Sequence, residues 1–421
     1  MRDRLPIVKF GAVIDSIAGG ATPLRANEDQ YADSGIRFLR IQNVTLTGFS
    51  FRDVKFITEE IHNNLLLRSQ LAENDLLMTI TGRIGTCAVV TRECLPANIN
   101  QHIVRVRLKP GVDPRFAAAY FNSSIGLMLS NRGVTGTTRT ALDYESIRNI
   151  PFPLVGSTEQ TRFIEEAESA QQSYMNRLKT AEKLLNSFES EVTELLGFSQ
   201  NTQIRMCYAI KLGDVDGVID AKRYARAKKD GEHTIEDICK ILDEKVNVSS
   251  LGDETIDWIR IDDLSNHPLE IKRVRTLPAY EMEGSFFRVK EGDILVARLG
   301  PTILNQKIVL VRKTERETLA SAEFLVLRCK KGYDAESIMA VLKTAYYRDL
   351  MYAQSRGSTP SRYRLNREDM GKLPFPDLRN VQHILSRQAR ELREQVKLMR
   401  LQAEQEWREA REQFERELLG R

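Results

Sequence analysis

The chain carries the same set of short sequence blocks twice, in the same order, with each copy displaced by about 220 residues. The recurring blocks are Ile36–Ile41 and Ile256–Ile261, Asn74–Leu77 and Gly292–Leu295, Arg132–Leu142 and Arg356–Leu365, and Ile150–Pro153 and Leu373–Pro376. This displacement is roughly half of the 421 residues, so each copy is long enough to bury a core of its own. A duplication on this scale predicts two domains of one fold that do one job at two places.

Residues 1–155 read as a mixed α/β domain in which strands dominate. Short β-branched or alternating runs, bounded by Gly, Asn and Pro, predict strands at Arg37–Val44, Asp75–Ile80, Cys87–Thr91 and Ile103–Leu108. Apolar residues at helical spacing predict one helix over Arg115–Leu129. Residues 201–378 repeat this plan, which makes them the second domain.

Each copy is followed by a segment with the periodicity of a long helix, at 156–200 and at 379–421. Ser157 and Gln160 have the spacing of a capping box at the start of the first segment. Apolar residues then follow at steps of three and four in both segments. The first series is Ile164, Ala167, Gln171, Tyr174, Leu178, Ala181, Leu185, Phe188, Val192 and Leu195, in which Gln171 is the one polar position, and the second is Leu385, Ala389, Leu392, Val396, Met399 and Ala403.

The residues at heptad spacing form an apolar stripe, or seam, along each long helix. The two helices bury these seams most simply by packing against each other. The predicted fold class is therefore α+β: two tandem mixed α/β domains, each followed by a long helix, with the two helices paired as an antiparallel coiled coil. In the alternative arrangement, each helix packs on its own domain or on a partner subunit.

Signatures of several enzyme classes are missing from the sequence. It has neither a phosphate-binding Gly-x-x-x-x-Gly-Lys-Ser/Thr loop nor a dinucleotide-binding Gly-x-Gly-x-x-Gly motif. A His-Glu-x-x-His pair, a Gly-x-Ser-x-Gly elbow and the Pro-Pro tetrad of DNA amino-methyltransferases are also missing. We therefore expect no catalytic residues, no metal site and no cofactor in this chain.

The composition indicates a cytoplasmic protein without a membrane span. No run of about 18 apolar residues occurs, and the first residues lack the apolar core of a signal peptide. The five cysteines are scattered without a Cys-x-x-Cys pair, which predicts reduced, mostly buried thiols. The formal net charge of +4 is compatible with a DNA-binding protein but carries little weight alone.

Two loops of the first copy have a composition suited to phosphate contact. Thr79–Thr86 joins two predicted strands through glycines and carries Arg83 near its tip. Arg132–Thr140 places two arginines among threonines and glycines, and its second copy, Ser355–Arg364, is more basic and carries a tyrosine. Backbone N–H groups, hydroxyls and guanidinium groups all donate to phosphate oxygens. An equally weighted alternative is a turn whose arginines pair with nearby carboxylates.

These blocks, in this order, resemble the specificity subunit of type I restriction–modification systems. The motifs that carry the resemblance are Gly19–Pro23, Gly35–Ile41, Asn74–Leu77 leading into Thr81–Gly85, Ile99–Gln101, Thr135–Arg139, Ile150–Pro153 and Glu159-Gln160. Each motif is loose alone. Their order, the duplication and the two long helices together make the set specific, and the resemblance extends over essentially the whole chain.

The resemblance implies two target-recognition domains, residues 1–155 and 201–378, each reading one half of a split, asymmetric double-stranded DNA sequence. The helices would set the gap between the halves. Such a subunit is not a catalyst. It docks two methyltransferase (modification) subunits, and restriction–translocation subunits join that core for host defence. S-adenosylmethionine, ATP and Mg²⁺ would be used by those partners, and no membrane would be involved.

Residues common to both copies cannot by themselves distinguish two different half-sequences, so we expect them to serve the scaffold or to contact phosphates. Base readout should lie where the copies differ, roughly at 45–72, 81–86 and 109–140, and at 265–290, 299–306 and 330–364. The DNA-binding candidates are Arg83, Arg132, Thr135, Thr138, Arg139, Arg298, Asn305, Gln306, Arg356, Ser358, Arg362 and Arg364.

The second copy departs from the family pattern. It has Gly300-Pro301-Thr302 in place of Gly-Arg-Ile-Gly, Val381-Gln382 in place of Glu-Gln, and Lys245–Val248 in place of the Gly-Gly-Ala-Thr-Pro turn. Two alternatives of other classes therefore stand beside the DNA reader. One is a protein–protein adaptor with degenerate DNA-binding domains, and the other is an undetected DNA-modifying enzyme.

Overall fold

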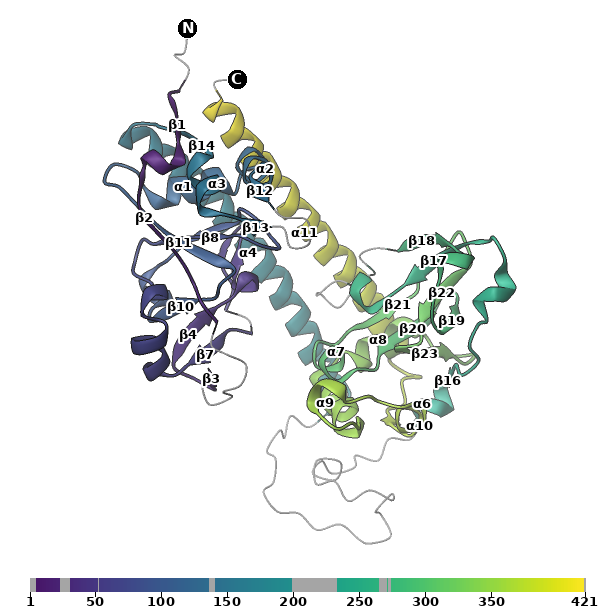
Figure 1. Cartoon of the computed structure of the whole chain (residues 1–421). Helices are drawn as coiled ribbons and strands as arrows, with labels where there is room; N and C mark the ends of the chain where they lie inside the picture. The colour runs from purple at the N-terminus through teal and green to yellow at the C-terminus, as the bar shows by residue number, and fades with distance from the viewer. Residues whose placement is uncertain are drawn as a thin grey trace. The chain divides into compact units, whose positions relative to one another are not determined.

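The computed structural model describes residues 5–22, 31–51, 53–135, 141–198, 233–264, 271 and 274–419 (Figure 1). The chain forms two compact units. The first comprises Met1–Lys179 with Arg400–Arg421, and the second comprises Thr180–Met399. Each unit thus combines one copy of the repeat with part of each long helix.

The first unit is built on two four-stranded sheets. The antiparallel sheet has the order β2-β11-β8-β9, and the mixed sheet has the order β10-β4-β7-β3, with β10 and β4 parallel. Their bounds are β2 Ile14–Gly19, β11 Ile103–Leu108, β8 Leu76–Thr79, β9 Cys87–Val89, β10 Ala97–Ile99, β4 Ile36–Leu39, β7 Lys55–Ile57 and β3 Tyr31–Ala32. A separate β1–β14 pair joins Ile7–Lys9 to Pro151–Pro153.

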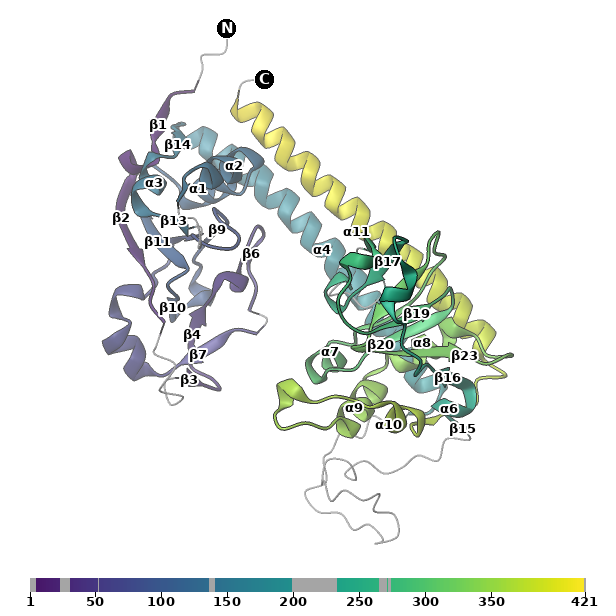
Figure 2. The ribbon, with the colours of Figure 1, turned by 45° about the vertical axis from the view of Figure 1, so that its right-hand side comes forward.

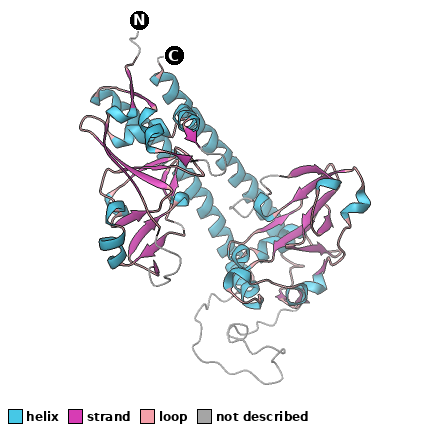
Figure 3. Cartoon of the chain, viewed as in Figure 1, coloured by secondary structure: helices cyan, strands magenta, loops and turns pink. Residues whose placement is uncertain are grey.

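The second unit repeats this topology in its antiparallel sheet and in three strands of its mixed sheet. Figure 3 distinguishes the strands and helices of both units by colour. Its antiparallel sheet has the order β16-β23-β20-β21, and its mixed sheet has the order β18-β17-β22-β19, with β17 and β22 parallel. Their bounds are β16 Cys239–Ile241, β23 Phe324–Cys329, β20 Asp293–Ala297, β21 Ile308–Leu310, β18 Arg275–Pro278, β17 Thr255–Ile259, β22 Thr318–Ser321 and β19 Phe286–Val289. The β15–β24 pair (His233–Thr234 with Pro374–Phe375) is the counterpart of β1–β14.

The mixed sheets differ at their edges. In the first unit a short strand, β3, pairs with β7, whereas in the second unit β19 pairs with β22. The shared core of each mixed sheet is therefore three strands, and each copy has added its own fourth strand at a different edge.

The predicted single helix over 115–129 is wrong: the segment forms two helices, α1 (Pro114–Phe121) and α2 (Ser124–Arg132). Ser123 starts the second helix, because its side chain accepts a hydrogen bond from the N–H of Gly126 at 3.1 Å. The second unit has the same break between α8 (Ala335–Leu342) and α9 (Ala345–Gln354). An apolar spacing that continues across both helices hid the turn between them.

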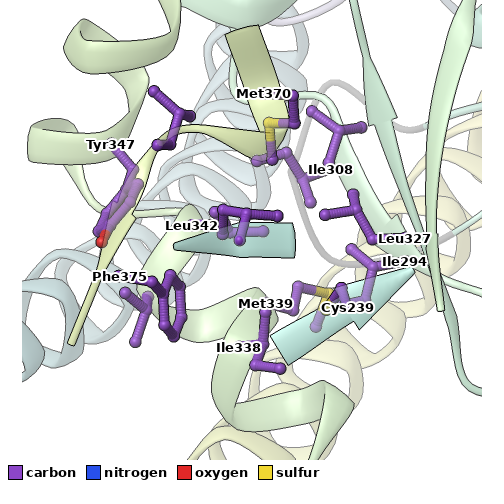
Figure 4. Packing of buried hydrophobic residues seen from close by; sticks show 14 of the residues in the cluster. Cys239, Ile294, Ile308, Leu327, Ile338, Met339, Leu342, Tyr347, Met370 and Phe375 are labelled. Carbon is purple, nitrogen blue, oxygen red and sulfur yellow. The ribbon is translucent and has the colours of Figure 1, made fainter. Parts of the chain in front are cut away.

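Each antiparallel sheet buries one face under these short helices. In the second unit, Ile294 and Leu327 of the sheet face Met339 of α8, with Tyr347 and Phe375 in the same cluster (Figure 4). The corresponding cluster of the first unit includes Leu76, Met78, Val104, Phe116 and Phe152. The β-branched and aromatic residues that predicted strands therefore form the cores of the two copies.

The two long helices are α4 (Ser157–Leu195) and α11 (Gln382–Leu418). The predicted seam is turned away from solvent from Ile164 to Val192, and only its last residue, Leu195, is 51% exposed. Every predicted seam residue of α11 is buried or half-buried. The heptad pattern therefore located the contact faces of both helices.

Halves of α4 and α11 lie side by side within each unit (Figure 2). In the first unit, ring centroids are 5.2 Å apart for Phe163 and Phe414 and 5.9 Å apart for Tyr174 and Trp407. In the second unit, Val192 packs in one cluster with Leu385. Because residues early in α4 meet residues late in α11, the helices are antiparallel. The predicted fold class is confirmed.

The capping box predicted at the start of α4 is wrong. Gln160 does not cap its own helix; its amide instead ties the helix to the preceding loops. Its Oε1 accepts from the N–H of Asp113 at 2.7 Å, and its Nε2 donates to the carbonyls of Gly111 and Val155, both at 2.9 Å. Gln382 at the start of α11 makes the same contacts to Asp334 and Gly332. The recurrent glutamine therefore attaches each long helix to its domain.

A glutamate from a long helix meets the N-terminus of the second short helix in each unit. In the first unit, the Oγ of Ser124 donates to Glu415 of α11 at 2.5 Å. In the second, the N–H of Ala345 donates to Glu189 of α4 at 2.5 Å. The carboxylates meet unpaired backbone N–H groups and the positive end of a helix dipole. Each copy is thus held by the helix that follows the other copy.

Candidate nucleic-acid interface

The loop between β8 and β9 folds back on itself and presents Arg83 to solvent. The N–H of Gly85 donates to the carbonyl of Thr79 at 2.9 Å, and the N–H of Thr86 donates to the carbonyl of Arg83 at 3.2 Å. The Thr79 hydroxyl also donates to the carbonyl of Arg83. The backbone at the tip is therefore held from two sides. The Arg83 side chain is exposed and forms no ion pair with any described residue.

Gly85 brings this loop against helix α2. It has a φ of +85°, and a Cβ at this position would lie 2.6 Å from the Cβ of Ser130. Only glycine accommodates both the conformation and the approach. Helix α2 ends two residues later at Arg132, whose side chain is exposed and forms no ion pair within the described part of the chain.

The second candidate loop of the first unit is joined to the first by a backbone hydrogen bond. Strands β12 (Val134–Thr135) and β13 (Ala141–Leu142) form its base, and the N–H of Leu142 donates to the carbonyl of Ile80 at 2.9 Å. The structure thus brings the loops that carry Arg83 and Arg132 together. Thr138, Arg139 and the side chain of Thr135 lie outside the described residues.

The second unit joins its two candidate loops in the same way. The N–H of Leu365 donates to the carbonyl of Arg298 at 2.9 Å, which repeats the contact between Leu142 and Ile80. Arg356 and Arg364 exchange two backbone hydrogen bonds at 3.0 and 2.8 Å. Helix α7 (Gly300–Leu304) begins beside this hairpin, since the N–H of Gly300 donates to the carbonyl of Tyr363 at 2.7 Å.

The arginines of this second loop pair differ in how they are engaged. Arg356 forms an ion pair with the buried Asp369 at 3.0 Å, and Arg364 forms one with Glu323 at 2.9 Å. Arg362 and Ser358 are exposed, and Arg362 forms no ion pair with a described residue.

Arg298 is half-buried at the base of the same loop pair, and its Nε is buried without a hydrogen-bond partner among the described atoms. A buried donor without a partner is costly unless a ligand or a water satisfies it. Arg298 and Arg362 are therefore the arginines of the second unit best placed to receive an anion.

Asn305 and Gln306 support the local fold. The Nδ2 of Asn305 donates to the carbonyl of Pro301 at 2.9 Å, at the end of α7. The Nε2 of Gln306 donates to the carbonyl of Lys343 at 2.5 Å, and Gln306 itself has a φ of +48°. Each side chain thus uses one of its two N–H donors to hold a neighbouring backbone carbonyl.

Some residues shared by both copies are clearly part of the scaffold. Asp293 is buried, receives two hydrogen bonds from Arg328 at 2.8 and 2.7 Å, and accepts from the N–H of Lys290. The hydrogen bond to Asp293 raises the pKa of Arg328 above its ordinary value. Asp75 makes the equivalent contacts with Arg107 and with the N–H of Ala72. The recurrent Asn/Gly-Asp motif therefore fixes a turn against the neighbouring strand.

A groove of about 980 Å³ lies elsewhere in the first unit, among β9, α1 and the paired helices. Its lining includes the rings of Phe49, Phe51 and Trp407. Exposed carboxylates also line it: Glu73, Glu165, Glu166, Glu168 and Glu406. Carboxylates repel phosphate. The basic loop pairs, rather than this groove, are therefore the candidate nucleic-acid interface.

The sequence analysis missed a buried polar cluster of the second unit. Glu336 is 3% exposed and pairs with Arg393 at 2.5 Å and with Arg312 at 2.6 Å. The Nζ of Lys343 is shielded from solvent and has no hydrogen-bond partner in the described structure. The pKa of Lys343 is lowered to about 7, mainly by burial; Glu336 opposes this shift, and Arg393 and Arg312 add to it. No sequence motif marks this cluster, because its members come from three separate segments, with Glu336 and Lys343 both from α8 and its C-cap.

No described helix is long and apolar enough to cross a membrane. Within the same residues, no group of three or more His, Cys, Asp and Glu side chains could hold a metal ion.

The chain matches solved structures over nearly its full length, at low sequence identity. Two of the three described here are S subunits of type I restriction–modification systems. The one from M. genitalium has 12% identity and a TM-score of 0.39, with 100% of this chain and 97% of that chain covered. The HsdS subunit from Thermoanaerobacter tengcongensis has 13% identity and a TM-score of 0.36, with 100% and 98% covered.

The third match is a chain from a structure that concerns complex assembly and conformational transition of the type I R-M system. It has 13% identity and a TM-score of 0.44, with 99% of this chain and 97% of that chain covered. No protein-family model matches the sequence, and no curated protein matches it.

Proposed function

We propose that the chain is the DNA-sequence-recognition scaffold of a type I restriction–modification complex. Residues 1–155 and 201–378 act as two target-recognition domains, and each reads one half of a bipartite DNA sequence. The long helices set the spacing between the halves and dock two methyltransferase subunits, which restriction–translocation subunits join. Catalysis, with S-adenosylmethionine, ATP and Mg²⁺, belongs to those cytoplasmic partners.

The observation that carries this proposal is the loop pair that is built twice. Leu142 and Ile80 in one unit, and Leu365 and Arg298 in the other, make the same backbone hydrogen bond. Each loop pair carries arginines on a backbone arrangement that both copies share, while the residues around these arginines differ between the copies. Two domains that recognise different half-sequences need the same backbone arrangement but different side chains for contact with the bases. The sequence motifs and their order support the same function.

Within this proposal, the side chains fall into two groups. Arg132 and Arg362 occupy positions of the recurrent loops where both copies have an arginine. We therefore assign them to phosphate contacts. Arg83 has no arginine counterpart in the Gly300–Thr302 segment, so we assign it to base readout in one half-site. Loss of one bidentate arginine–guanine contact costs about 1–3 kcal/mol. Loss of a phosphate contact instead reduces the salt dependence of binding.

The experiment selects bound duplexes from a randomised DNA library with the full chain, alone and assembled with methyltransferase subunits. The wild-type chain should recover a split motif. Arg83→Ala should relax the preference in one half only, and Arg92→Ala, which removes an exposed arginine away from both loops, should change neither half. Recovery of no split motif, or equal weakening of both halves by Arg83→Ala, would refute the proposal. Duplexes with altered spacing between the halves test the role of the helices.

A second candidate, a protein–protein adaptor, is favoured by the ion pairs of the second unit. Arg356 and Arg364 already have carboxylate partners in Asp369 and Glu323. A domain whose arginines serve its own fold has fewer cations to offer to phosphates. Binding to generic duplex DNA at increasing salt separates the two functions, because a DNA reader weakens steeply with salt and an adaptor shows no such binding.

A further inference from the structure

Two cysteines of the second unit face each other across neighbouring antiparallel strands. Cys239 of β16 is directly opposite Cys329 of β23 in the register of the sheet. The Sγ of Cys239 donates to the Sγ of Cys329 at 3.8 Å. The two residues are 90 positions apart in the sequence, so no spacing motif reveals the pair.

The backbone geometry at this pair suits a cross-strand disulfide. The N–H of Lys330 donates to the carbonyl of Ile238, and the N–H of Leu242 donates to the carbonyl of Val326, so the cysteines occupy a non-hydrogen-bonded position between these contacts. Opposite residues at such positions have Cα atoms about 4.5 Å apart and side chains close together. A disulfide joins residues whose Cα atoms are roughly 4.4–6.8 Å apart, so the strands need no rearrangement.

The two thiols differ in accessibility. Cys239 is 1% exposed and points into the core beside Met339 and Ile338, whereas Cys329 is half-buried (Figure 4). The hydrogen bond to Cys329, together with burial, holds the pKa of Cys239 well above its ordinary value. Cys329 is therefore the thiol that a dissolved oxidant reaches first, and Cys239 is the thiol positioned to resolve it.

The corresponding position of the first unit contains an apolar pair, Ile14 opposite Leu108. The fold therefore requires only small or apolar side chains here, and a thiol pair is a feature of the second copy alone. β16 is also the edge strand of its sheet, held by β23 on one side only. A covalent bond at this place would attach an edge strand of the sheet to its neighbour.

We propose that Cys239 and Cys329 form a redox-sensitive pair that hydrogen peroxide converts into a cross-strand disulfide, which locks the edge of the second domain. The Cys329 thiolate attacks the peroxide: an S–O bond forms, the O–O bond breaks, and the leaving hydroxide is protonated to water. Cys239 then attacks the resulting sulfenic acid. An S–S bond forms, the S–O bond breaks, and hydroxide leaves as water with the proton from Cys239. Two thiols and one peroxide thus give one disulfide and two waters.

The disulfide would stabilise the second domain, because it closes a loop of 90 residues in the unfolded chain. The proposal is independent of DNA recognition, since it concerns the edge of a sheet and its readout is thiol chemistry. It holds or fails whichever function the domains have.

The test treats the full-length protein with hydrogen peroxide, blocks the remaining thiols with N-ethylmaleimide, and maps the cysteine peptides by mass spectrometry. We expect a peptide pair linked through Cys239 and Cys329, with the loss of two hydrogens, reversed by dithiothreitol. The oxidised wild-type protein should also unfold several degrees higher than the reduced form. Cys239→Ser should abolish both results.

Two matched variants make the outcomes decisive. Cys94→Ser removes a buried thiol of the first unit and should leave the linked peptide and the stabilisation unchanged. Cys207→Ser removes the cysteine that lies outside the described residues and should also leave them unchanged. Retention of both thiols, overoxidation of Cys329 without a link, or a link from Cys329 to Cys207 would each overturn the proposal.

Discussion

Replacement of Lys343 by methionine should stabilise the second unit, and the gain should depend on pH. The Nζ of Lys343 is shielded from solvent beside one carboxylate, Glu336, and two guanidinium groups, those of Arg312 and Arg393. Burial disfavours the charged form of the lysine, and one negative neighbour against two positive ones does not offset this, so the pKa of Lys343 falls on folding. Methionine keeps a similar length and fills the same space without a charge.

The pKa gives the sign and the upper limit of the effect. It falls from 10.5 to about 7 on folding, and about 1.4 kcal/mol per pKa unit makes the limit about 5 kcal/mol. Below pH 7 the lysine is charged in both the folded and the unfolded chain, so the full cost is present. Between pH 7 and about 10 the unfolded chain binds more protons than the folded one, so the wild-type protein regains stability as pH rises.

Lys343 as a whole is half-buried, so structural relaxation and water penetration reduce the cost of burying its charge. We therefore expect Lys343→Met to raise the free energy of unfolding by about 2 kcal/mol at pH 6. For a unit of this size, 2 kcal/mol corresponds to a rise in Tm of roughly 4–8 °C. The difference between variant and wild type should shrink steadily by pH 9.

Thermal unfolding followed by circular dichroism measures this difference, and hydrogen–deuterium exchange of the α8 peptides assigns it to the second unit. Lys372→Met is the matched control: Lys372 forms an exposed pair with Glu368, and its loss should change stability by less than about 1 kcal/mol at any pH. A Lys343→Met protein that is no more stable than wild type at pH 6, or a gain that is as large at pH 10 as at pH 6, would refute the argument from burial and charge.

Two further predictions concern the supports of the candidate interface. Gly85→Ala should lower Tm more than Gly111→Ala does. Both glycines have a positive φ, but only a Cβ at position 85 would collide with Ser130. Equal losses of Tm would contradict the packing of the loop on α2. Gln160→Leu should lower the free energy of unfolding, measured in denaturant, by about 1–3 kcal/mol, because it removes the hydrogen-bond partners of buried backbone groups. Gln172→Leu, at an exposed helix position, should leave the free energy of unfolding nearly unchanged. A similar cost at both glutamines would contradict the anchoring role.

The fold was largely predictable because its strongest signals are local or repeated. Heptad spacing located the seams of α4 and α11, since the period depends only on neighbours along one helix. The duplicated blocks predicted two copies of one domain, and the equivalent hydrogen bonds of Asp75 and Asp293 explain why those blocks recur. The break at Ser123 was missed because apolar spacing continues through it and only the cap reveals the turn.

The candidate site was predictable only in part. The sequence placed arginines in two loops of each copy, but the engagement of Arg356 by Asp369 and of Arg364 by Glu323 depends on packing between segments. The DNA-binding candidates therefore stay predictions. The contacts now separate exposed arginines such as Arg83 and Arg362 from those that already have partners.

By itself, the sequence determined the duplication, the strand-rich plan of each copy and the faces on which the long helices pair, because each follows from periodicity or recurrence along the chain. Only the tertiary structure decided which distant residues meet. Strand register set Cys239 opposite Cys329, and packing of separate segments placed Arg312 and Arg393 beside Glu336 and Lys343. Such encounters join positions far apart in the chain, and their energies depend on burial and on neighbouring charges, which no local pattern encodes.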